Sequence, residues 1–448
     1  MQDHYVLPPT TLAAMREAAG GWLTPGRATA IAAAPGRLDV MGGIADYSGA
    51  VVLEGTIGDL AVVAVQRRDD DLLRVRTVGP ETHRLERREF SLRTSDFCAG
   101  GPAGGLAGGG NVLKPYDAVQ ALFPEEARWA AYVLGVCYVL LAEGELAALP
   151  GGADVLLSST VPLGAGVASS AAVEVAAMRA IVAAYGAGTS GLRLAALCQL
   201  VENRVVGAPC GIMDQVTCAL GQAGALLALR CQPHDVLGWH APPAGYGFAG
   251  LDSGVKHAVG GRRYGRVRCA AFMGRRIIGE HLAAAGGDRE RAAYLCNLTP
   301  DEYRTRFRHL LPTRLSGREF LECWGDTGDS ATTIDPAQTY AVRGATEHPI
   351  YENDRVLRFM AKLQQAGAAV QAGDRKQAQR AIRAAGRLMY GSHRSYSRNC
   401  GLGSKETDLL VSLVRQAGPD AGLFGAKITG GGSGGTVAVL LETAAGGA

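Results

Sequence analysis

The chain has 448 residues, of which 47% are hydrophobic and 19% are charged, and its formal net charge is +3. This composition is that of a folded globular protein and excludes intrinsic disorder over most of the chain. The small net charge is not gathered into a lysine- or arginine-rich face, so nucleic-acid binding is not indicated. The length predicts two or three domains, or one two-lobed unit.

The sequence shows no targeting or membrane signal. Its longest nearly apolar run, 129–142, is shorter than the roughly 20 residues that a bilayer requires, and the first residues lack the apolar core of a signal peptide. The ten cysteines form no C-x-x-C unit, which argues against a zinc site and is typical of thiols in a reducing compartment. We therefore expect a cytoplasmic protein without membrane contact, as a monomer or small homo-oligomer.

Strand and helix patterns alternate along the chain. A helix is expected in the first 25 residues, and a surface insertion in the glycine-rich stretch 99–110. Alternating or β-branched patterns predict strands at 60–65, 73–78, 83–92, 154–158, 225–230, 247–252 and 436–441. Helical patterns cover 129–149, 168–185, 192–206, 211–220, 263–286, 353–372, 374–390 and 405–416. The sum is a mixed α+β protein with lobes at 1–230 and 231–448.

The strongest local signal is a glycine turn between a predicted strand and helix, 161–175 (VPLGAGVASSAAVEV). Gly164 and Gly166 allow backbone amides to converge, and the following helix offers unpaired N–H groups and the positive end of its dipole. This geometry binds phosphate, and Ser169 and Ser170 place hydroxyls where they reach a phosphate or its magnesium ion. The alternative is a tight turn without a ligand. No Walker A lysine follows.

Two other segments place charges among small or apolar residues. The segment 34–49 (APGRLDVMGGIADYSG) carries Arg37, Asp39 and Asp46, which indicates a pocket wall rather than a solvated surface turn. The segment 202–215 (ENRVVGAPCGIMDQ) sets Glu202 and Asp214 on either side of a Gly-x-Pro-x-Gly break. A carboxylate at the start of a helix is either a partner of the helix dipole or a catalytic group.

A third glycine-rich loop, 427–436 (KITGGGSGGT), precedes the last predicted strand. Its flexibility exceeds that of a simple turn and suits a backbone that closes over phosphates. Three such loops in this order, with GIMDQ at 211–215, resemble the GHMP kinase superfamily and its galactokinase branch. The segments WAAYV at 129–133 and GRLMYGSH at 386–393, and Tyr264 with Arg268 and Cys269, carry the same resemblance.

The sequence is still more similar to the kinase half of plant L-arabinokinases. The segments that carry this similarity are 37–49, LDSGVKH at 251–257, YLCN at 294–297 and HPIYEN at 348–353. The glycosyltransferase-like half of those proteins has no counterpart here, so a stand-alone kinase is expected. The resemblance implies a ribosomal-S5-like N-terminal lobe and a ferredoxin-like C-terminal lobe, with ATP and sugar between them.

The resemblance also implies roles for single residues. Asp214 matches the catalytic aspartate that takes the proton of the sugar C1 hydroxyl, and Arg37 matches the arginine that stabilises that oxygen and the transferring phosphoryl group. Glu202 and Ser170 match the Mg²⁺ ligands, and Trp129 matches a tryptophan near the adenine. The ATP phosphates would lie on Gly164, Ala165, Gly166, Val167, Ala168, Ser169 and Ser170. The sugar would contact Arg37, Asp39, Asp46, Gly211, Asp214 and Tyr264.

One departure from the galactokinase pattern bears on the substrate. Where galactokinases usually have Gly-Glu-His-Thr-Asp-Tyr, residues 42–47 are GGIADY, so Gly43 and Ile44 replace the glutamate and the histidine. In galactokinases that glutamate binds the 6-hydroxyl of the sugar. L-Arabinopyranose shares the C2–C4 configuration of D-galactose but has no C6 group. A buried carboxylate without its partner hydroxyl would cost binding energy, and glycine removes that cost.

We therefore expect an ATP-dependent kinase that converts L-arabinose into β-L-arabinose 1-phosphate, with Ile44 filling the space of the missing side chain. Two alternatives remain open at this point. One is a galactokinase that binds galactose differently, and the other is a sugar sensor that has lost turnover on the same scaffold. The retention of Arg37, Ser170, Glu202 and Asp214 argues against the sensor.

Overall fold

The computed structural model describes residues 13, 15, 17, 19–78, 88–99, 112–256 and 262–443. Its contacts group the chain into two compact units. Unit 1 consists of Met1–Arg37, Ile57–Pro162 and Ala168–Leu220, and unit 2 of Leu38–Thr56, Leu163–Val167 and Gly221–Ala448. The units thus interleave along the chain, whereas the division into functional lobes near residue 230 stays a prediction. The mixed α+β class is confirmed, and no helix of the described residues is long and apolar enough to cross a bilayer.

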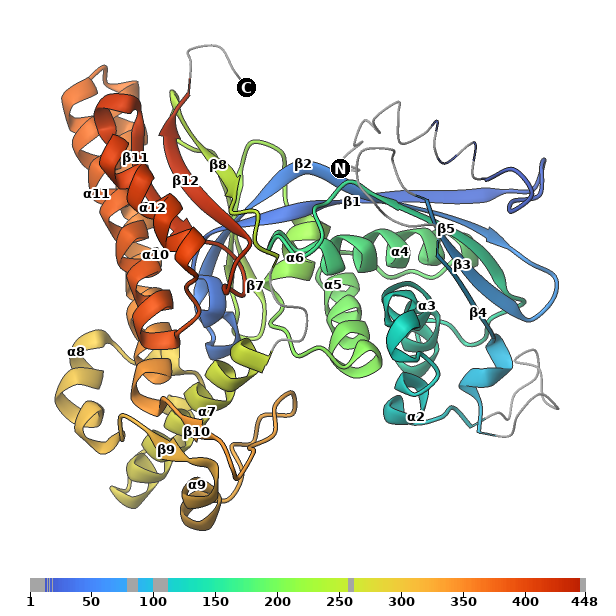
Figure 1. Ribbon diagram of the computed structural model, residues 1–448, viewed down its shortest axis with the longest axis horizontal. Coiled ribbons are helices and arrows are strands. Elements are labelled where there is room, and N and C mark those ends of the chain that lie inside the picture. Colours follow the sequence, from blue (N-terminus) through green and yellow to red (C-terminus); the bar gives the residue numbers. More distant parts are fainter. Residues whose placement is uncertain are drawn as a thin grey trace. The chain divides into compact units, whose positions relative to one another are not determined.

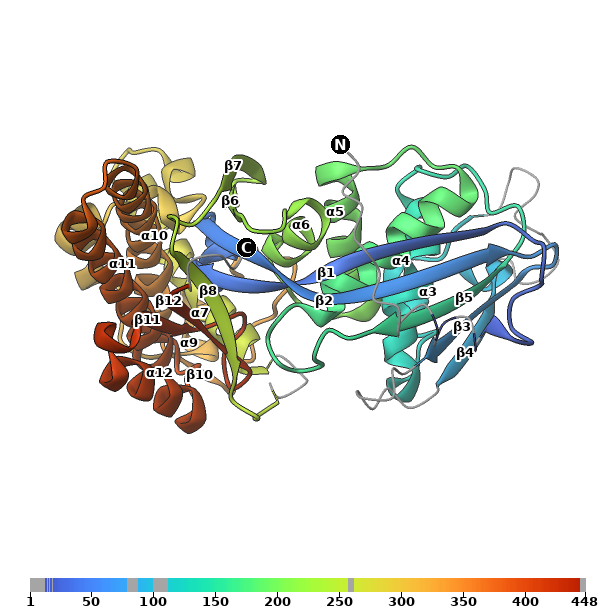
Figure 2. The same ribbon diagram turned by 90° about the horizontal axis from the view of Figure 1, so that it is seen from above.

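Unit 1 is a sheet covered by helices. Strand β5 (Ala153–Ser159) pairs in parallel with β3 (Leu72–Val78) and antiparallel with residues 61–67 of β2 (Val51–Arg67), while β4 (Glu89–Arg93) forms the edge beside β3. Helices α3 (Arg128–Ala142) and α4 (Ser169–Tyr185) pack together on one face of these strands (Figures 1 and 2). The remaining helical elements of this unit are α2 (Tyr116–Gln120), α5 (Gly191–Leu200), a π-helical turn (Val201–Val206) and α6 (Met213–Leu220).

Unit 2 contains a second sheet and a helical layer. Its three-stranded antiparallel sheet has the order β11 (Leu423–Ile428), β12 (Thr436–Glu442), β8 (Tyr246–Asp252). Helix α10 (Val342–Gln371) packs against α11 (Arg375–Ser395) and α7 (Arg262–Ala284), and α11 and α12 (Lys405–Ala417) lie on β11 (Figure 1). Strand β6 (Leu226–Arg230) pairs with residues 51–55 of β2 and with β7 (Asp235–His240). The smaller elements include α8 (Pro300–Glu302), β9 (Leu315–Ser316), α9 (Gly317–Trp324) and β10 (Thr339–Tyr340).

Several expected boundaries were wrong for local reasons. The segment 34–49 is not one loop, because its first eight residues belong to β1 (Thr29–Met41) and the rest form a 3₁₀ helix, Gly43–Ser48. Helix α3 ends at Ala142, not at 149, since Gly144 adopts a positive φ of 74° just beyond it. Helix α10 starts eleven residues before 353 and passes through Pro349, although proline usually marks a helix boundary.

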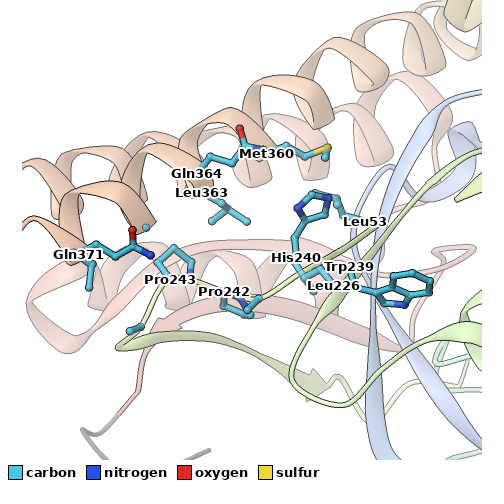
Figure 3. A pocket seen from close by; sticks show the side chains of 14 residues that line it. Leu53, Leu226, Trp239, His240, Pro242, Pro243, Met360, Leu363, Gln364 and Gln371 are labelled. Atoms are coloured by element: carbon cyan, nitrogen blue, oxygen red, sulfur yellow. The ribbon is translucent and has the colours of Figure 1, made fainter. Parts of the chain in front are cut away.

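Unit 2 has a cavity of about 390 Å³ between α10 and the segment 239–244. In Figure 3, Met360, Leu363 and Gln364 of α10 face His240 and Pro242. Its other lining residues are mostly apolar, and none of the residues that the sequence nominated as a site lines it.

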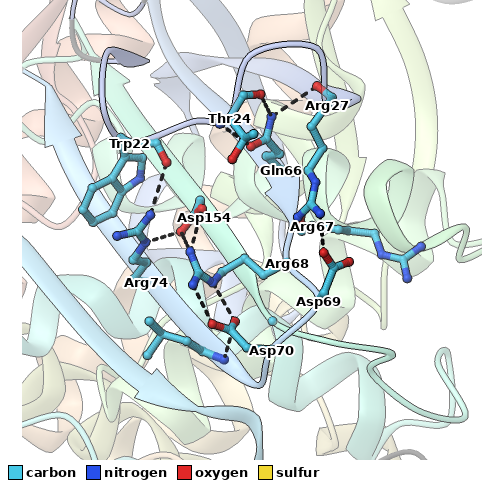
Figure 4. A network of polar contacts seen from close by, with 12 residues as sticks. Trp22, Thr24, Arg27, Gln66, Arg67, Arg68, Asp69, Asp70, Arg74 and Asp154 are labelled. Carbon is cyan, nitrogen blue, oxygen red and sulfur yellow. Dashed lines mark hydrogen bonds and ion pairs between the residues drawn. The ribbon is translucent and has the colours of Figure 1, made fainter.

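A polar network fixes the segment before β1 to the sheet of unit 1 (Figure 4). The Gln66 side chain donates to the carbonyls of Thr24 and Arg27 at 3.1 and 3.2 Å and accepts from the Thr24 N–H at 2.7 Å. Beside it, the buried carboxylate of Asp154 is paired with both Arg68 and Arg74. Through Gln66, these contacts attach the residues just before β1 to strand β2.

Candidate active site

The two residues nominated for catalysis meet in unit 1. Arg37, near the end of β1, donates from Nε to Oδ1 of Asp214 at 3.0 Å, and its Nη2 reaches the same oxygen. Arg37 is 2% exposed, whereas the Asp214 side chain is 25% exposed at the start of α6. Burial strengthens a charge-assisted contact of this kind. The structure therefore brings the pair together, and their catalytic roles remain predictions.

The second carboxylate oxygen of Asp214 is left available. The Nε and Nη2 atoms of Arg37 both donate to Oδ1. No residue that the structure describes donates a hydrogen bond to Oδ2. A carboxylate fixed through one oxygen and partly exposed through the other can accept a proton in a defined direction. This arrangement suits a group that meets the hydroxyl of a substrate.

Next to this pair lies a buried cluster of two glutamates and one glutamine. The Gln215 amide donates to Glu202 Oε2 at 2.6 Å and to Glu174 Oε2 at 3.2 Å. Burial and the nearby charge of Asp214 raise the pKa of Glu202 to about 7. Burial and Glu202 likewise raise the pKa of Glu174 well above its usual range. Sequence reasoning missed Glu174 and Gln215, although Glu174 stands out as a charge among the apolar residues of α4.

Ser170 and Glu202, the nominated metal ligands, lie close together, and the Ser170 hydroxyl acts to lower the pKa of Glu202 against the effect of burial. Within the described residues, no group of three or more histidine, cysteine or acidic side chains could hold a metal ion. Mg²⁺ needs no such cage, because it usually takes one or two protein ligands and completes its shell with phosphates and water. Glu174 Oε1 is buried without a hydrogen-bond partner in this part of the chain, which leaves an unsatisfied polar oxygen beside the pair. Ser170 and Glu202 therefore fit a magnesium ion.

The first glycine loop is well formed for phosphate binding. Gly164 and Gly166 have φ values of 72° and 70°, and Ala168 adopts a left-handed conformation at 59°. An alanine held in this region is uncommon, and such strain is concentrated at ligand-binding turns. Ser169 and Ser170 are the first two residues of α4, whose leading N–H groups have no partner within the helix.

The third glycine loop packs on the first within unit 2. A Cβ atom at Gly435 would lie 2.6 Å from the carbonyl oxygen of Ala165, and one at Gly166 would lie 3.4 Å from that of Thr429. Glycine at 435 is therefore required by the close approach of the two backbones. Lys427 and Ile428 belong to β11, so only 429–435 form the loop.

Unit 2 also gathers two nominated sugar contacts, Asp46 and Tyr264. Tyr264, in the first turn of α7, stands edge-on to Tyr47 with ring centroids 5.9 Å apart. Arg268, one turn later, lies 5.6 Å from the Tyr47 ring and forms a bidentate pair with Asp329 at 2.9 and 2.8 Å. The Tyr47 hydroxyl is buried and finds no hydrogen-bond partner among the described residues. Aromatic faces with polar hydroxyls and a fixed charge are suited to a sugar.

Two other nominated contacts have structural partners instead. Asp39 is wholly buried, and its carboxylate accepts from Lys427 Nζ at 2.6 Å and from the N–H groups of Gly43 and Gly430 at 3.1 and 3.2 Å. Ile44 is 1% exposed and packs in the hydrophobic core of unit 2. Tyr47 and Tyr264 pack against the same cluster, and the expectation that the Ile44 side chain fills space beside the sugar stays a prediction.

The last two nominated residues lie at the ends of unit 1 helices. Trp129 is half-buried in the first turn of α3, and Gly211 is half-buried just before α6. The structure shows no contact that decides their roles, so both stay predictions.

Comparisons with known proteins agree with this geometry. Residues 131–222 match the N-terminal domain of GHMP kinases. The chain is 39% identical to an L-arabinokinase of Arabidopsis thaliana over 95% of its own length, and it spans 44% of that relative. It is 31% identical to a galactokinase of Streptomyces coelicolor, with 92% of this chain and 84% of that protein covered.

A solved galactokinase of Lactococcus lactis, complexed with galactose, has the same fold. The TM-score is 0.68 at 20% identity, with 96% of this chain and 90% of that one covered. The expected GHMP kinase fold is thereby confirmed. Because the resemblance to a galactokinase extends over nearly the whole of both sequences, the chain belongs to the galactokinase family of the GHMP kinase superfamily.

Proposed function

We propose that the chain is an ATP-dependent sugar kinase that phosphorylates the anomeric hydroxyl of L-arabinose, giving β-L-arabinose 1-phosphate and ADP. The observation that carries the chemistry is the buried Arg37 holding one oxygen of Asp214 while the other stays available. Phosphoryl transfer requires alignment, charge neutralisation and a modest proton acceptor, and little covalent work by the protein.

In the proposed reaction the sugar O1 forms a bond to the γ-phosphorus of ATP as the bond to the β–γ bridging oxygen breaks. The electron pair of that bond leaves with ADP, and the proton of the C1 hydroxyl passes to Asp214 Oδ2. Arg37 keeps the carboxylate oriented and places its positive charge beside the attacking oxygen. The glycine loop with Ser169 and Ser170 holds the phosphates through backbone N–H groups.

Ser170 and Glu202 would hold magnesium. When bound, the ion would neutralise phosphate charge and stabilise the ionised form of the buried Glu202. The role of this chain is to keep Glu202 in place through the Gln215 amide, which donates to it at 2.6 Å.

The sugar assignment is supported by the segment 42–47 and by the resemblance to a plant enzyme. Position 43 has no carboxylate to receive a 6-hydroxyl, and the Arabidopsis relative is an L-arabinokinase. The competing substrate is D-galactose, because the Streptomyces and Lactococcus proteins that resemble this chain are galactokinases. A non-catalytic sensor is disfavoured because the Arg37–Asp214 pair is assembled. We also propose a cytoplasmic location, since the ten cysteines, all within the described residues, form no disulfide bond.

A coupled assay of ADP release over a panel of pentoses and hexoses tests this proposal. The product should then be examined by phosphorus NMR, where a phosphate on the anomeric carbon shows coupling to the anomeric proton. The proposal predicts turnover with L-arabinose and a 1-phosphate product. No ADP release with any sugar, or a phosphate on another carbon, would exclude it.

A further inference from the structure

Position 43 is closed to any side chain by a tyrosine from far along the sequence. A Cβ atom at Gly43 would overlap the hydroxyl oxygen of Tyr396 and would lie 2.6 Å from its Cζ and 2.8 Å from Asp39 Oδ2. Tyr396 and Asp39 are both 0% exposed, so neither can move aside into solvent. The glycine and the tyrosine are therefore sterically matched, and the space of the missing side chain is filled by Tyr396.

The Tyr396 hydroxyl also holds the segment 42–46 through the backbone. It accepts from the Ile44 N–H at 2.9 Å and donates to the Gly430 carbonyl at 3.1 Å. Burial, followed by the charge of Asp39, raises the pKa of Tyr396 well above its usual value, so the phenol stays protonated and keeps its donor. One side chain thus bridges the segment 42–46 and the third glycine loop, 429–435.

An ion pair beneath the phenol fixes the same two loops. Lys427 and Asp39 are both fully buried and 2.6 Å apart, and Asp39 holds the N–H groups of Gly43 and Gly430. The Lys427 ammonium lies 5.2 Å from the centre of the Tyr396 ring, and His348 meets the ring edge-on at 5.1 Å. This packing restricts the Tyr396 side chain to one conformation, because the neighbours named here are themselves buried.

We infer that Tyr396 is a positioning residue that sets sugar specificity: it fills the space of a side chain at position 43 and holds the 42–46 backbone where it faces the sugar. The inference rests on the proposed function of that loop. The ligand class that fits is an aldopentopyranose, which has no hydroxymethyl group to place in the closed space. Replacing Gly43 alone cannot create a hexose site, because Tyr396 must be replaced by a smaller residue at the same time.

Kinetics of the Tyr396→Phe variant test the positioning role. The change removes the hydroxyl that holds the Ile44 N–H, so KM for L-arabinose should rise about tenfold or more, as expected when a buried polar group loses its partner. KM for ATP should rise less than KM for the sugar, because the Gly430 N–H of the third glycine loop stays held by Asp39, whereas the Ile44 N–H loses its partner. The control is Tyr390→Phe, a half-buried tyrosine of α11, the helix that ends one residue before Tyr396.

A double-mutant cycle of thermal stability tests the steric match. Gly43→Ala should lower the melting temperature strongly in the wild type and much less in a Tyr396→Ala background, where the obstructing ring is gone. Equal losses in the two backgrounds would overturn the match. Where a variant has too little activity for kinetics, the shift in melting temperature caused by L-arabinose measures sugar binding directly.

The outcomes separate this inference from the proposed function. A wild type that does not use L-arabinose refutes the proposed function, and the specificity claim fails with it. A wild type that prefers L-arabinose, with unchanged KM values and an unchanged ratio to D-galactose in Tyr396→Phe, refutes the inference alone. A selective rise of KM for the sugar, together with a strong coupling in the cycle, supports it.

Discussion

Replacing Glu202 by glutamine is expected to stabilise the metal-free protein at alkaline pH and to have little effect near pH 5. Burial and Asp214 raise the pKa of Glu202 to about 7, against about 4.3 in an unfolded chain. Below the lower value both states are protonated, and the carboxyl costs nothing. As the pH rises toward the higher value, the unfolded state releases its proton first, and stability falls.

The size of the effect follows from the pKa difference. A difference of about 2.7 units at 1.36 kcal/mol each gives about 3.6 kcal/mol of lost stability at pH 8, and about 1 kcal/mol at pH 5. Glutamine has nearly the same shape and no charge, so the variant should recover most of this energy. For a domain of 150–250 residues, that corresponds to roughly 6–12 °C in melting temperature.

The assay is thermal unfolding from pH 5 to pH 8 in EDTA, without nucleotide. The matched control is Glu125→Gln, an exposed glutamate of the same unit, whose difference from the wild type should be small at every pH. A Glu202→Gln variant that is less stable than the wild type at pH 8, or shifted equally at both ends of the range, would refute the reasoning. Adding magnesium with ATP should reduce the difference in melting temperature between Glu202→Gln and the wild type, because the ion binds the wild-type site more tightly.

The remaining predictions concern the same two units. Asp214→Asn should lower kcat about 10²–10⁴-fold, as for a positioned proton acceptor, and leave the affinity for ATP in a direct titration unchanged; retention of a tenth of the activity would contradict it. Ser170→Ala should raise the magnesium concentration needed for half-maximal rate, so an unchanged magnesium curve would place the ligand elsewhere. Burial lowers the pKa of His348 to about 4. The unfolded state therefore binds the proton first below about pH 6.5, and stability should fall from there to pH 4 by up to about 3 kcal/mol. In His348→Asn, which retains a polar atom toward Ser395, this part of the acid slope should vanish in urea unfolding; an equal slope would contradict it.

The sequence was informative where structure is local. Helix α4 and strand β5 were predicted within one residue of their observed ends, because apolar periodicity and a glycine turn mark both. Strand β1 was missed because Pro35, Gly36 and two charges interrupt its pattern, and only pairing with β2 makes it a strand. Helix α10 was predicted too short, because Pro349 in its first turns was taken to mark a helix boundary.

The candidate site divides in the same way. Arg37 and Asp214 were found because charges among small and apolar residues are visible in a sequence, although their contact spans 177 positions. Lys427 and Tyr396 were not, because the need for a buried partner of Asp39 and for a filled space at Gly43 arises only in the folded chain. The contact between Arg37 and Asp214 could therefore be anticipated, whereas the packing around Gly43 could not.

The central claim is that this kinase is built for a pentose without a C6 group, and the ratio of kcat/KM for L-arabinose to that for D-galactose tests it most directly. A missing acceptor and a space closed by Tyr396 should disfavour the hydroxymethyl group by about 10- to 200-fold. The account predicts a ratio in this range in favour of L-arabinose, measured with the same enzyme preparation at saturating ATP. A ratio of one or below would contradict it.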